Sequence, residues 1–426
     1  MKEKELIIYR NPVRGTLLED MVSLMERYRQ QEDKSLVFSC MSRLLEQAVS
    51  HGFYGNLWHC YLTDFLVNHE NSYSMACEIR GNIEGSINEL VLHDIEIFRY
   101  WYQFDFTELI QTLQVPELAS LFSYEAGSAG GRVYNTRIRD RICKLARQFD
   151  MDKTTVDMKN SLTEFYKDYG VGRFGLHKAF RVNHTGNDAE IVPIRNIAHV
   201  KLDDLVGYEI PKKKLTDNTE AFVSGRKANN CLLFGDAGTG KSSSIKAVAN
   251  EYYDRGLRII ELYKHQFRDL NDVIAQIKNR NYKFIIYMDD LSFEDFETEY
   301  KYLKAVIEGG LEKKPDNVLI YATSNRRHLI REKFSDKEDR KDSMHAGDTV
   351  QEKLSLASRF GVTIYFGSPD KKQFQQIVLA LADRFGVTMD RETLLAEANK
   401  WELAHSGLSG RTAQQFIDYL LGQQTV

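Results

Sequence analysis

The stretch from Cys231 to Asn250 constrains the fold of this chain more than any other. It begins with a short apolar run, continues as a glycine-rich turn, and ends in a helical pattern with apolar residues at Ile245, Val248 and Ala249. An apolar run of this length without a breaker predicts a buried parallel strand. A strand, a glycine turn and a helix in this order predict an α/β domain.

The turn carries the phosphate-binding loop pattern, in which Gly235 and Gly240 enclose four residues and are followed by Lys241 and Ser242. Glycines let the backbone approach phosphate oxygens without a Cβ clash, and the following helix presents its positive N-terminal end to an anion. We expect Lys241 to reach the β- and γ-phosphates and Ser242 to place its hydroxyl on Mg²⁺. The alternative, an ordinary glycine turn, is disfavoured by the strand and helix around it. The predicted nucleotide-binding segment comprises Gly235, Asp236, Ala237, Gly238, Thr239, Gly240, Lys241, Ser242 and Ser243.

Length and composition indicate a soluble protein of two or three domains. The chain has 426 residues, of which 28% are charged and 42% hydrophobic. A net charge of −4 excludes a chain that is basic throughout, so any nucleic-acid contact would need a local patch. Five scattered cysteines without a CxxC pair indicate reduced thiols and argue against a structural zinc. With no apolar signal core and no apolar run of ~18 residues, we expect a cytoplasmic protein without a membrane partner.

Residues 1–195 are predicted to form a mostly α-helical N-terminal domain. Apolar residues recur at helical spacing in four stretches, the last of which, 87–106, is rich in aromatic residues. No stretch shows a convincing period-two alternation of a half-buried strand. This pattern favours a helical bundle that packs its own core, through which we expect an unknown protein or nucleic-acid partner to bind.

Two stretches of this half have competing interpretations. The basic residues of 132–147 suit either an arm for nucleic acid or acidic protein, or the solvated face of a helix. The lack of interleaved aromatic residues favours the solvated face. Gly170, Gly172 and Gly175 form a G-x-G-x-x-G pattern, but a helical pattern precedes it and no acidic strand end follows. We therefore interpret it as a connecting loop and not as a dinucleotide site.

Residues 196–368 are predicted to form the nucleotide-binding domain. Ahead of the phosphate loop, Val206 and Gly207 lie in a tight turn before a helix, where they can line an adenine pocket or serve ordinary packing. Besides the strand at Cys231, short apolar runs predict four further strands. They cover residues 257–262, 283–289, 317–325 and 362–366.

Polar residues end two of these strands. Asp289 and Asp290 close one apolar run, as in the second part of a phosphate-loop site, where a carboxylate holds Mg²⁺, usually through water. We assign that role to Asp289 and expect Asp290 to orient and polarise the attacking water. Asn325 ends the next strand and is placed to contact the γ-phosphate or that water, although asparagine at a strand end is often a turn former.

A strongly charged segment separates the fourth and fifth predicted strands along the chain. The highly charged segment 331–353 predicts a mobile surface excursion. Arg359 follows it at the edge of the sheet, where it could complete a neighbouring subunit's site and so imply a homo-oligomer.

Residues 369–426 predict a lid of three helices. Arg411 begins the last of them, and an arginine there can fold back over the phosphates. The alternative, a plain first-turn arginine, is unfavourable with the helix dipole.

In their order along the chain, these elements resemble those of the AAA+ ATPases. The phosphate loop and the acidic strand end are followed by Asn325 as first sensor, Arg359 as arginine finger and Arg411 as second sensor. More narrowly, the C-terminal half looks like the bacterial family known as domain of unknown function 815. The supporting phrases are Leu205–Tyr208, Asn218–Phe222, Asp289–Phe293, Pro315–Leu329 and Ser409–Arg411. The resemblance implies a P-loop NTPase fold, with a five-stranded parallel sheet, helices on both faces and a small helical lid.

One departure from the superfamily bears on catalysis. Most AAA+ enzymes have Asp-Glu where this chain has Asp289 and Asp290. Aspartate is one methylene shorter, and misplacement on the scale of ~1 Å can lower a rate about a hundredfold. We therefore expect slow or partner-dependent hydrolysis, with Glu294 and Glu297 as nearby acids that could substitute.

The sequence supports two functional hypotheses. The first is an ATPase that binds ATP with Mg²⁺ and hydrolyses it to ADP and phosphate to remodel a macromolecular partner. The second is a slow ATP-dependent switch with little intrinsic hydrolysis. The order of sensors and arginine finger argues against a small-molecule kinase. A GTPase is disfavoured because the Asn-Lys-x-Asp pattern is missing, since Asn399-Lys-Trp-Glu402 ends in the wrong residue.

Overall fold

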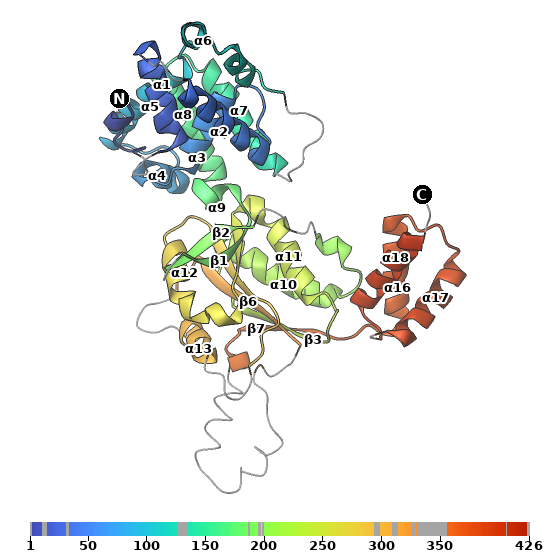
Figure 1. The fold of residues 1–426 in the computed structure, drawn as a ribbon. Helices are drawn as coiled ribbons and strands as arrows, with labels where there is room; N and C mark the ends of the chain where they lie inside the picture. Colours follow the sequence, from blue (N-terminus) through green and yellow to red (C-terminus); the bar gives the residue numbers. More distant parts are fainter. Residues whose placement is uncertain are drawn as a thin grey trace. The chain divides into compact units, whose positions relative to one another are not determined.

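The computed structural model forms two compact units, 1–177 and 178–426, which we describe separately (Figure 1). It describes residues 2–10, 15–30, 34–125, 135–185, 188–194, 197, 200–293, 299–308, 314–325, 329, 356–405 and 407–423. Glu294, Glu297, the charged segment 331–353 and the start of the basic segment at 132–134 lie outside the described residues.

The first unit is helical, as the apolar spacing predicts. Its helices are α1 (Leu17–Arg27), α2 (Ser35–His51), α3 (Leu57–Asn68), α4 (Ser72–Arg80), α5 (Ile87–Tyr102), α6 (Thr107–Leu113), α7 (Thr136–Met151), α8 (Thr155–Tyr169) and α9 (Gly172–Leu176). Thr16 caps α1 by accepting a hydrogen bond from the Glu19 N–H at 3.3 Å. The aromatic residues are largely core, since Trp58, Trp101 and Tyr166 are at most 1% exposed.

The two stretches with competing interpretations are both helical in their described parts. Gly170 ends α8 and Gly172 begins α9, so the G-x-G-x-x-G pattern joins two helices and no strand precedes it. The interpretation as a connection is confirmed. In α7 the Arg141 guanidinium lies 4.1 Å from the centre of the Tyr169 ring, and Arg147 lies 5.2 Å from that of Tyr54. Aromatic rings thus flank this helix from other elements, although its own sequence has none at these positions.

The second unit is built on a seven-stranded sheet in the order β2-β1-β4-β5-β6-β3-β7. All neighbouring strands are parallel except β1 and β2. The strands are β1 (Ala179–Thr185), β2 (Asp188–Pro193), β3 (Cys231–Gly235), β4 (Leu257–Glu261), β5 (Lys283–Met288), β6 (Val318–Ser324) and β7 (Val362–Phe366). The five predicted strands are confirmed and lie next to one another, but β1 adds a sixth parallel strand beside β4 and β2 an antiparallel seventh, so the sheet is larger than the five-stranded one expected.

The β1–β2 hairpin corrects the expectation of no strands before the phosphate-loop domain. β1 pairs with β4 in parallel, from Ala179 opposite Ile259, and so extends the sheet at one edge. Phe180 and Val182 are buried while Arg181 is exposed, which is the alternation of a half-buried strand. The alternation is short, and its apolar partners lie on two other strands, since Phe180 pairs with Ile260 of β4 and Val182 with Ile191 of β2.

Helices cover both faces of the sheet, as predicted (Figure 1). α10 (Glu209–Val223) and α11 (Lys241–Glu251) lie on one face, where Leu215 and Ile245 join a core with Tyr287. α12 (Leu270–Ile277) and α13 (Tyr300–Glu308) lie on the other.

The lid consists of α16 (Lys371–Phe385), α17 (Arg391–Ala404) and α18 (Gly410–Gln423), which share a small core of their own. This matches the three predicted lid helices. Across the part of the chain that the structure describes, no helix has both the length and the apolar composition to cross a membrane.

Candidate functional site

The phosphate-loop pattern lies where β3 ends and α11 begins. Gly235, Gly238 and Gly240 all have positive φ, at 135°, 75° and 90°. A Cβ at Gly235 would lie 2.0 Å from the backbone oxygen of Phe366 in β7. The first glycine is therefore required by both conformation and close approach, since no other residue could bring β3 and β7 together at this turn.

Lys241 is held inside the loop. Its ammonium donates hydrogen bonds to the backbone oxygens of Gly235 at 2.9 Å and Asp236 at 2.6 Å, and to Asn325 Oδ1 at 3.0 Å. The side chain is only 6% exposed, and this burial lowers the pKa of Lys241 while nearby carboxylates oppose the change. The loop thus presents a positive charge from its interior.

Asp289 is fixed by two hydroxyl groups. Ser242 Oγ donates to Asp289 Oδ1 at 2.7 Å, and Thr323 Oγ1 donates to the same oxygen at 2.6 Å. Burial raises the pKa of the Asp289 carboxyl, but the hydroxyl groups of Thr323, Tyr287 and Ser242 and the charge of Lys246 outweigh it, so the pKa is lowered overall. The site therefore places an ionised carboxylate beside a serine hydroxyl.

These oxygen groups suit a hard divalent cation. Mg²⁺ usually takes one or two protein ligands and completes its shell with water and substrate phosphates. Within the described ranges, no group of three or more His, Cys, Asp or Glu side chains gathers into a metal site. A metal at Ser242 and Asp289 would accordingly depend on phosphate oxygens, which is the usual arrangement for Mg²⁺ with a nucleotide.

Asp290 adopts an uncommon backbone conformation. Its φ is 49°, in the left-handed region that aspartate tolerates better than most residues. The Asp290 N–H donates to Thr323 Oγ1 at 2.9 Å, and Asn325 Nδ2 donates to Asp290 Oδ1 at 2.8 Å. Because Asn325 also accepts from Lys241, a continuous chain of hydrogen bonds joins Lys241, Asn325 and Asp290.

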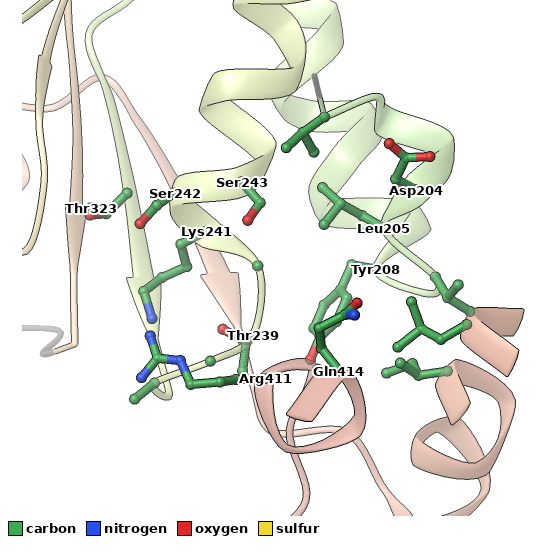
Figure 2. A pocket seen from close by; sticks show the side chains of 18 of the residues that line it. Asp204, Leu205, Tyr208, Thr239, Lys241, Ser242, Ser243, Thr323, Arg411 and Gln414 are labelled. Atoms are coloured by element: carbon green, nitrogen blue, oxygen red, sulfur yellow. The ribbon is translucent and has the colours of Figure 1, made fainter. Parts of the chain in front are cut away.

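The lid touches the phosphate loop at the start of α18. The Arg411 N–H donates to the Gly238 backbone oxygen at 3.2 Å, and a Cβ at Gly238 would lie 3.0 Å from Ser409 Oγ. Arg411 and Lys241 extend toward the same region in Figure 2, and the Arg411 charge contributes to lowering the pKa of Lys241. Two neighbouring cations in one pocket favour an anion between them.

A cavity of about 680 Å³ brings these groups together. Of the residues predicted from the sequence, its lining contains Val206, Ala237, Gly238, Thr239, Gly240, Lys241, Ser242, Ser243, Asp289, Asp290, Asn325 and Arg411. Gly235, Asp236 and Gly207 belong to the adjoining backbone and do not line it. Arg359 also lies outside the cavity, three residues before β7 begins.

The lining also contains residues that were not among the predicted site residues, although Leu205 and Tyr208 belong to the turn expected to line an adenine pocket (Figure 2). On the lid side, Arg384 of α16 forms an ion pair with Asp204 at 3.1 Å. Tyr208 has a φ of 60°, and its hydroxyl donates to the Gly367 backbone oxygen at 3.0 Å. Thr323 could have been inferred, because it lies two residues before Asn325 and so on the same face of β6.

The lining also has an apolar side. It is formed by Leu205 and Val206 together with Ile377 and Leu381 of α16. Val206 packs against the core of the lid. This combination of apolar walls with a few convergent polar groups is typical of small-molecule and cofactor sites.

Comparison with known proteins confirms the family that the sequence resembles. The family model described as "Protein of unknown function (DUF815)" matches residues 175–424, more than half of the chain. The replication factor C large subunit of Staphylothermus marinus is 36% identical over 74 residues, covering 17% of this chain and 17% of that protein. The large subunit from Methanococcus maripaludis strain C6 is 39% identical over 77 residues, covering 18% and 15%. The chain thus spans less than a fifth of these relatives.

Among solved structures, the chain is similar to the Thermotoga maritima RuvB Holliday junction branch migration motor. The identity is 14% and the TM-score 0.33, over 51% of this chain and 71% of that one.

Proposed function

Because the chain belongs to the DUF815 family of proteins of unknown function, within the AAA+ ATPase superfamily, we propose that it binds ATP with Mg²⁺ and hydrolyses it to ADP and phosphate. The observation that carries the proposal is the convergence of phosphate-loop, acidic and lid residues on one cavity of about 680 Å³. Lys241, Asp289 and Arg411 come from three separate parts of the chain. Their meeting at a glycine-rich loop suits a triphosphate better than a neutral ligand.

Binding would use the loop amides, Lys241 and Arg411 for the phosphates. Lys241 now bonds to loop oxygens and Asn325, and its ammonium would turn to the β- and γ-phosphates when these arrive. Arg411 begins a lid helix that already contacts Gly238, so phosphate binding would draw the lid and the loop together. The apolar wall at Val206, with the adjacent turn at Gly207, would receive the adenine base.

Ser242 and Asp289 would hold the metal, Asp289 through water. Bound Mg²⁺ supplies positive charge that offsets the negative charge developing on the phosphate oxygens during transfer. The hydrogen bond from Ser242 Oγ to Asp289 Oδ1 holds these two groups next to each other.

Asp290 and Asn325 would organise the water. The water would attack the γ-phosphorus, the bond to the β–γ bridging oxygen would break, and ADP would leave with that electron pair, while the protons of the water stay on the phosphate that is released. Asp290 would orient the water and polarise its O–H bond, while Asn325 fixes the Asp290 carboxylate through the 2.8 Å hydrogen bond.

We further propose that Arg359 completes the site of a neighbouring subunit, so that the ATP-bound protein forms a homo-oligomer. Its position outside this chain's own cavity supports an action in trans. The helical N-terminal region would bind the protein or nucleic acid that turnover remodels, in keeping with its separate core.

The alternative is a slow ATP-dependent switch with little hydrolysis. It is favoured by Asp290, whose carboxylate is a methylene shorter than glutamate and is held by Asn325. In that case the ATP-bound and ADP-bound lid positions, and not turnover, would alter a partner contact.

ATP turnover separates the two functions. We would compare the wild type with Lys241→Ala and Asp290→Ala, using Lys301→Ala on the exposed face of α13 as a lysine control. Mass would be determined in the same samples with and without ATP. An oligomeric ATPase predicts turnover that both site variants lose, normal turnover in the control, and ATP-dependent assembly. Tight ATP binding with neither turnover nor assembly supports the switch, and no ATP binding refutes both.

A further inference from the structure

Tyr287 in β5 has a buried hydroxyl that makes no hydrogen bond with a described residue. Its side chain is only 2% exposed. Buried polar atoms in native proteins are nearly always paired, so an unpaired one calls for a physical reason. A phenylalanine would fill the same space without leaving a polar atom unpaired.

The neighbouring strand β6 shows that a buried tyrosine hydroxyl in this sheet can have hydrogen-bond partners. Tyr321 in β6 lies directly opposite Tyr287 and is also buried. Its hydroxyl bonds to Asn218 at 3.0 Å and to Thr219 at 2.9 Å, both in α10. The two tyrosines share a face of the sheet, and only Tyr321 has side-chain partners there among the described residues.

Tyr287 lies beside the proposed metal site. It precedes Asp289 by two residues, which places both side chains on the same face of the chain at the end of β5. That face packs against α11, whose first turn carries Ser242. Burial raises the pKa of Tyr287, and the Asp289 carboxylate is the next cause, while the Tyr287 hydroxyl in turn lowers the pKa of Asp289. The phenol hydroxyl therefore lies close to Asp289 and to Ser242, although no hydrogen bond of normal geometry joins it to either.

The surroundings allow the hydroxyl to turn. The Tyr287 ring borders a cavity of about 190 Å³ together with Lys246 and Glu261. A phenol hydrogen rotates about its C–O bond and can donate to whichever acceptor approaches. On Asp289, the two hydroxyl donors already described both bond to Oδ1. A carboxylate that takes up metal-bound water needs its second oxygen oriented as well.

We propose that Tyr287 is a positioning residue for the metal-binding carboxylate, whose hydroxyl donates to Asp289 when Mg²⁺ and ATP are bound. This rests on the proposed function of the same site. The hydroxyl holds the carboxylate plane in the orientation that metal-bound water requires. Tyr287 touches neither ATP nor the metal.

The test is Tyr287→Phe, with Tyr321→Phe as a matched loss of a buried phenol hydroxyl from the same sheet. Affinity for a fluorescent ATP analogue would be measured in EDTA and during a Mg²⁺ titration, and thermal unfolding would be followed without nucleotide. Outer partners of metal ligands typically change metal affinity about 10- to 100-fold. We expect Tyr287→Phe to raise the half-saturating Mg²⁺ concentration by about this factor. The affinity in EDTA should stay unchanged, and the Tm should stay unchanged or rise.

Tyr321→Phe should give the opposite pattern, with a lower Tm and an unchanged Mg²⁺ titration. A Tyr287→Phe titration that overlays the wild type overturns the proposal, as does an equal loss of affinity in EDTA and in Mg²⁺, which would mean a purely structural role. The wild-type arm tests the proposed function separately. If wild-type affinity does not respond to Mg²⁺, the metal site itself is refuted and the positioning role fails with it.

Discussion

Thr323→Val tests whether one hydroxyl organises both acidic residues of the site. The Thr323 side chain is 1% exposed, donates to Asp289 at 2.6 Å and accepts from the Asp290 N–H at 2.9 Å. Valine has the same branched shape and differs by carrying a methyl group in place of the hydroxyl. The substitution therefore removes two hydrogen bonds with little change in packing.

The expected loss of stability follows from those two bonds. A hydrogen bond to a charged group contributes about 1.5–3 kcal/mol and a neutral one about 0.5–1.5 kcal/mol. Asp289 is partly open to solvent and keeps its bond from Ser242, so the lower ends of both ranges apply. We expect the free energy of unfolding to fall by about 2 kcal/mol. Because Thr323 also orients a proposed metal ligand, ATP turnover should fall by about tenfold or more.

The stability loss should depend on pH. Burial raises the pKa of the Asp289 carboxyl, but the hydrogen bonds, that of Thr323 first among them, lower it overall in the folded protein. A carboxyl with a lowered folded pKa stabilises the fold above its unfolded pKa of about 3.9 and loses that contribution as pH falls through the folded pKa. The difference between wild type and Thr323→Val should therefore be full at neutral pH and shrink below about pH 4.

Urea unfolding at neutral pH and at about pH 3 measures this difference. Thr323→Ser, which keeps the hydroxyl, is the control and should retain most of the stability at neutral pH and most of the turnover. If Thr323→Val is as stable as the wild type at neutral pH, the hydrogen-bond argument is refuted. A loss of equal size at both pH values would refute its link to the Asp289 charge.

Two further substitutions test the backbone of the site. Gly235→Ala should lower the free energy of unfolding by at least about 3 kcal/mol and abolish ATP binding, because its Cβ would lie 2.0 Å from the Phe366 oxygen. Gly256→Ala, whose φ is also positive but whose Cβ would meet nothing within 4 Å, should lose only about 1–2 kcal/mol in the same urea titration. Asp290→Glu should not raise ATP turnover above that of the wild type, because a longer side chain loses the short hydrogen bond from Asn325 and favours the left-handed backbone less. Faster turnover of Asp290→Glu would show instead that side-chain reach limits the reaction.

The parts of the site that the sequence predicted depend on local signals. Gly235, Lys241 and Ser242 lie within eight residues, and their spacing follows from one turn between a strand and a helix. Asp289 and Asn325 each end an apolar run, and parallel strands bring such ends to one edge of a sheet. Local pattern and sheet geometry together were therefore enough to place these side chains near one another.

The parts that the sequence did not predict depend on pairing between distant segments. The ion pair of Arg384 with Asp204 joins residues that share no motif, and neither residue differs in its local pattern from an ordinary surface charge. The β1 strand was missed because only Phe180 and Val182 carry its apolar face, and the strand that completes their burial, β4, lies about 80 residues further on. Such contacts become visible only when the sheet order is known.

The backbone geometry at Asp290 offers a reason for aspartate at this position that the sequence alone did not suggest. The sequence suggested a catalytic acid that is too short, because aspartate lacks one methylene of glutamate. In the structure the residue has a φ of 49°, and a hydrogen bond at its N–H and another at its carboxylate fix it there. Aspartate is among the few residues that adopt this conformation readily. The reach of the Asp290 carboxylate therefore depends on this backbone turn as well as on side-chain length, and the two have to be considered together.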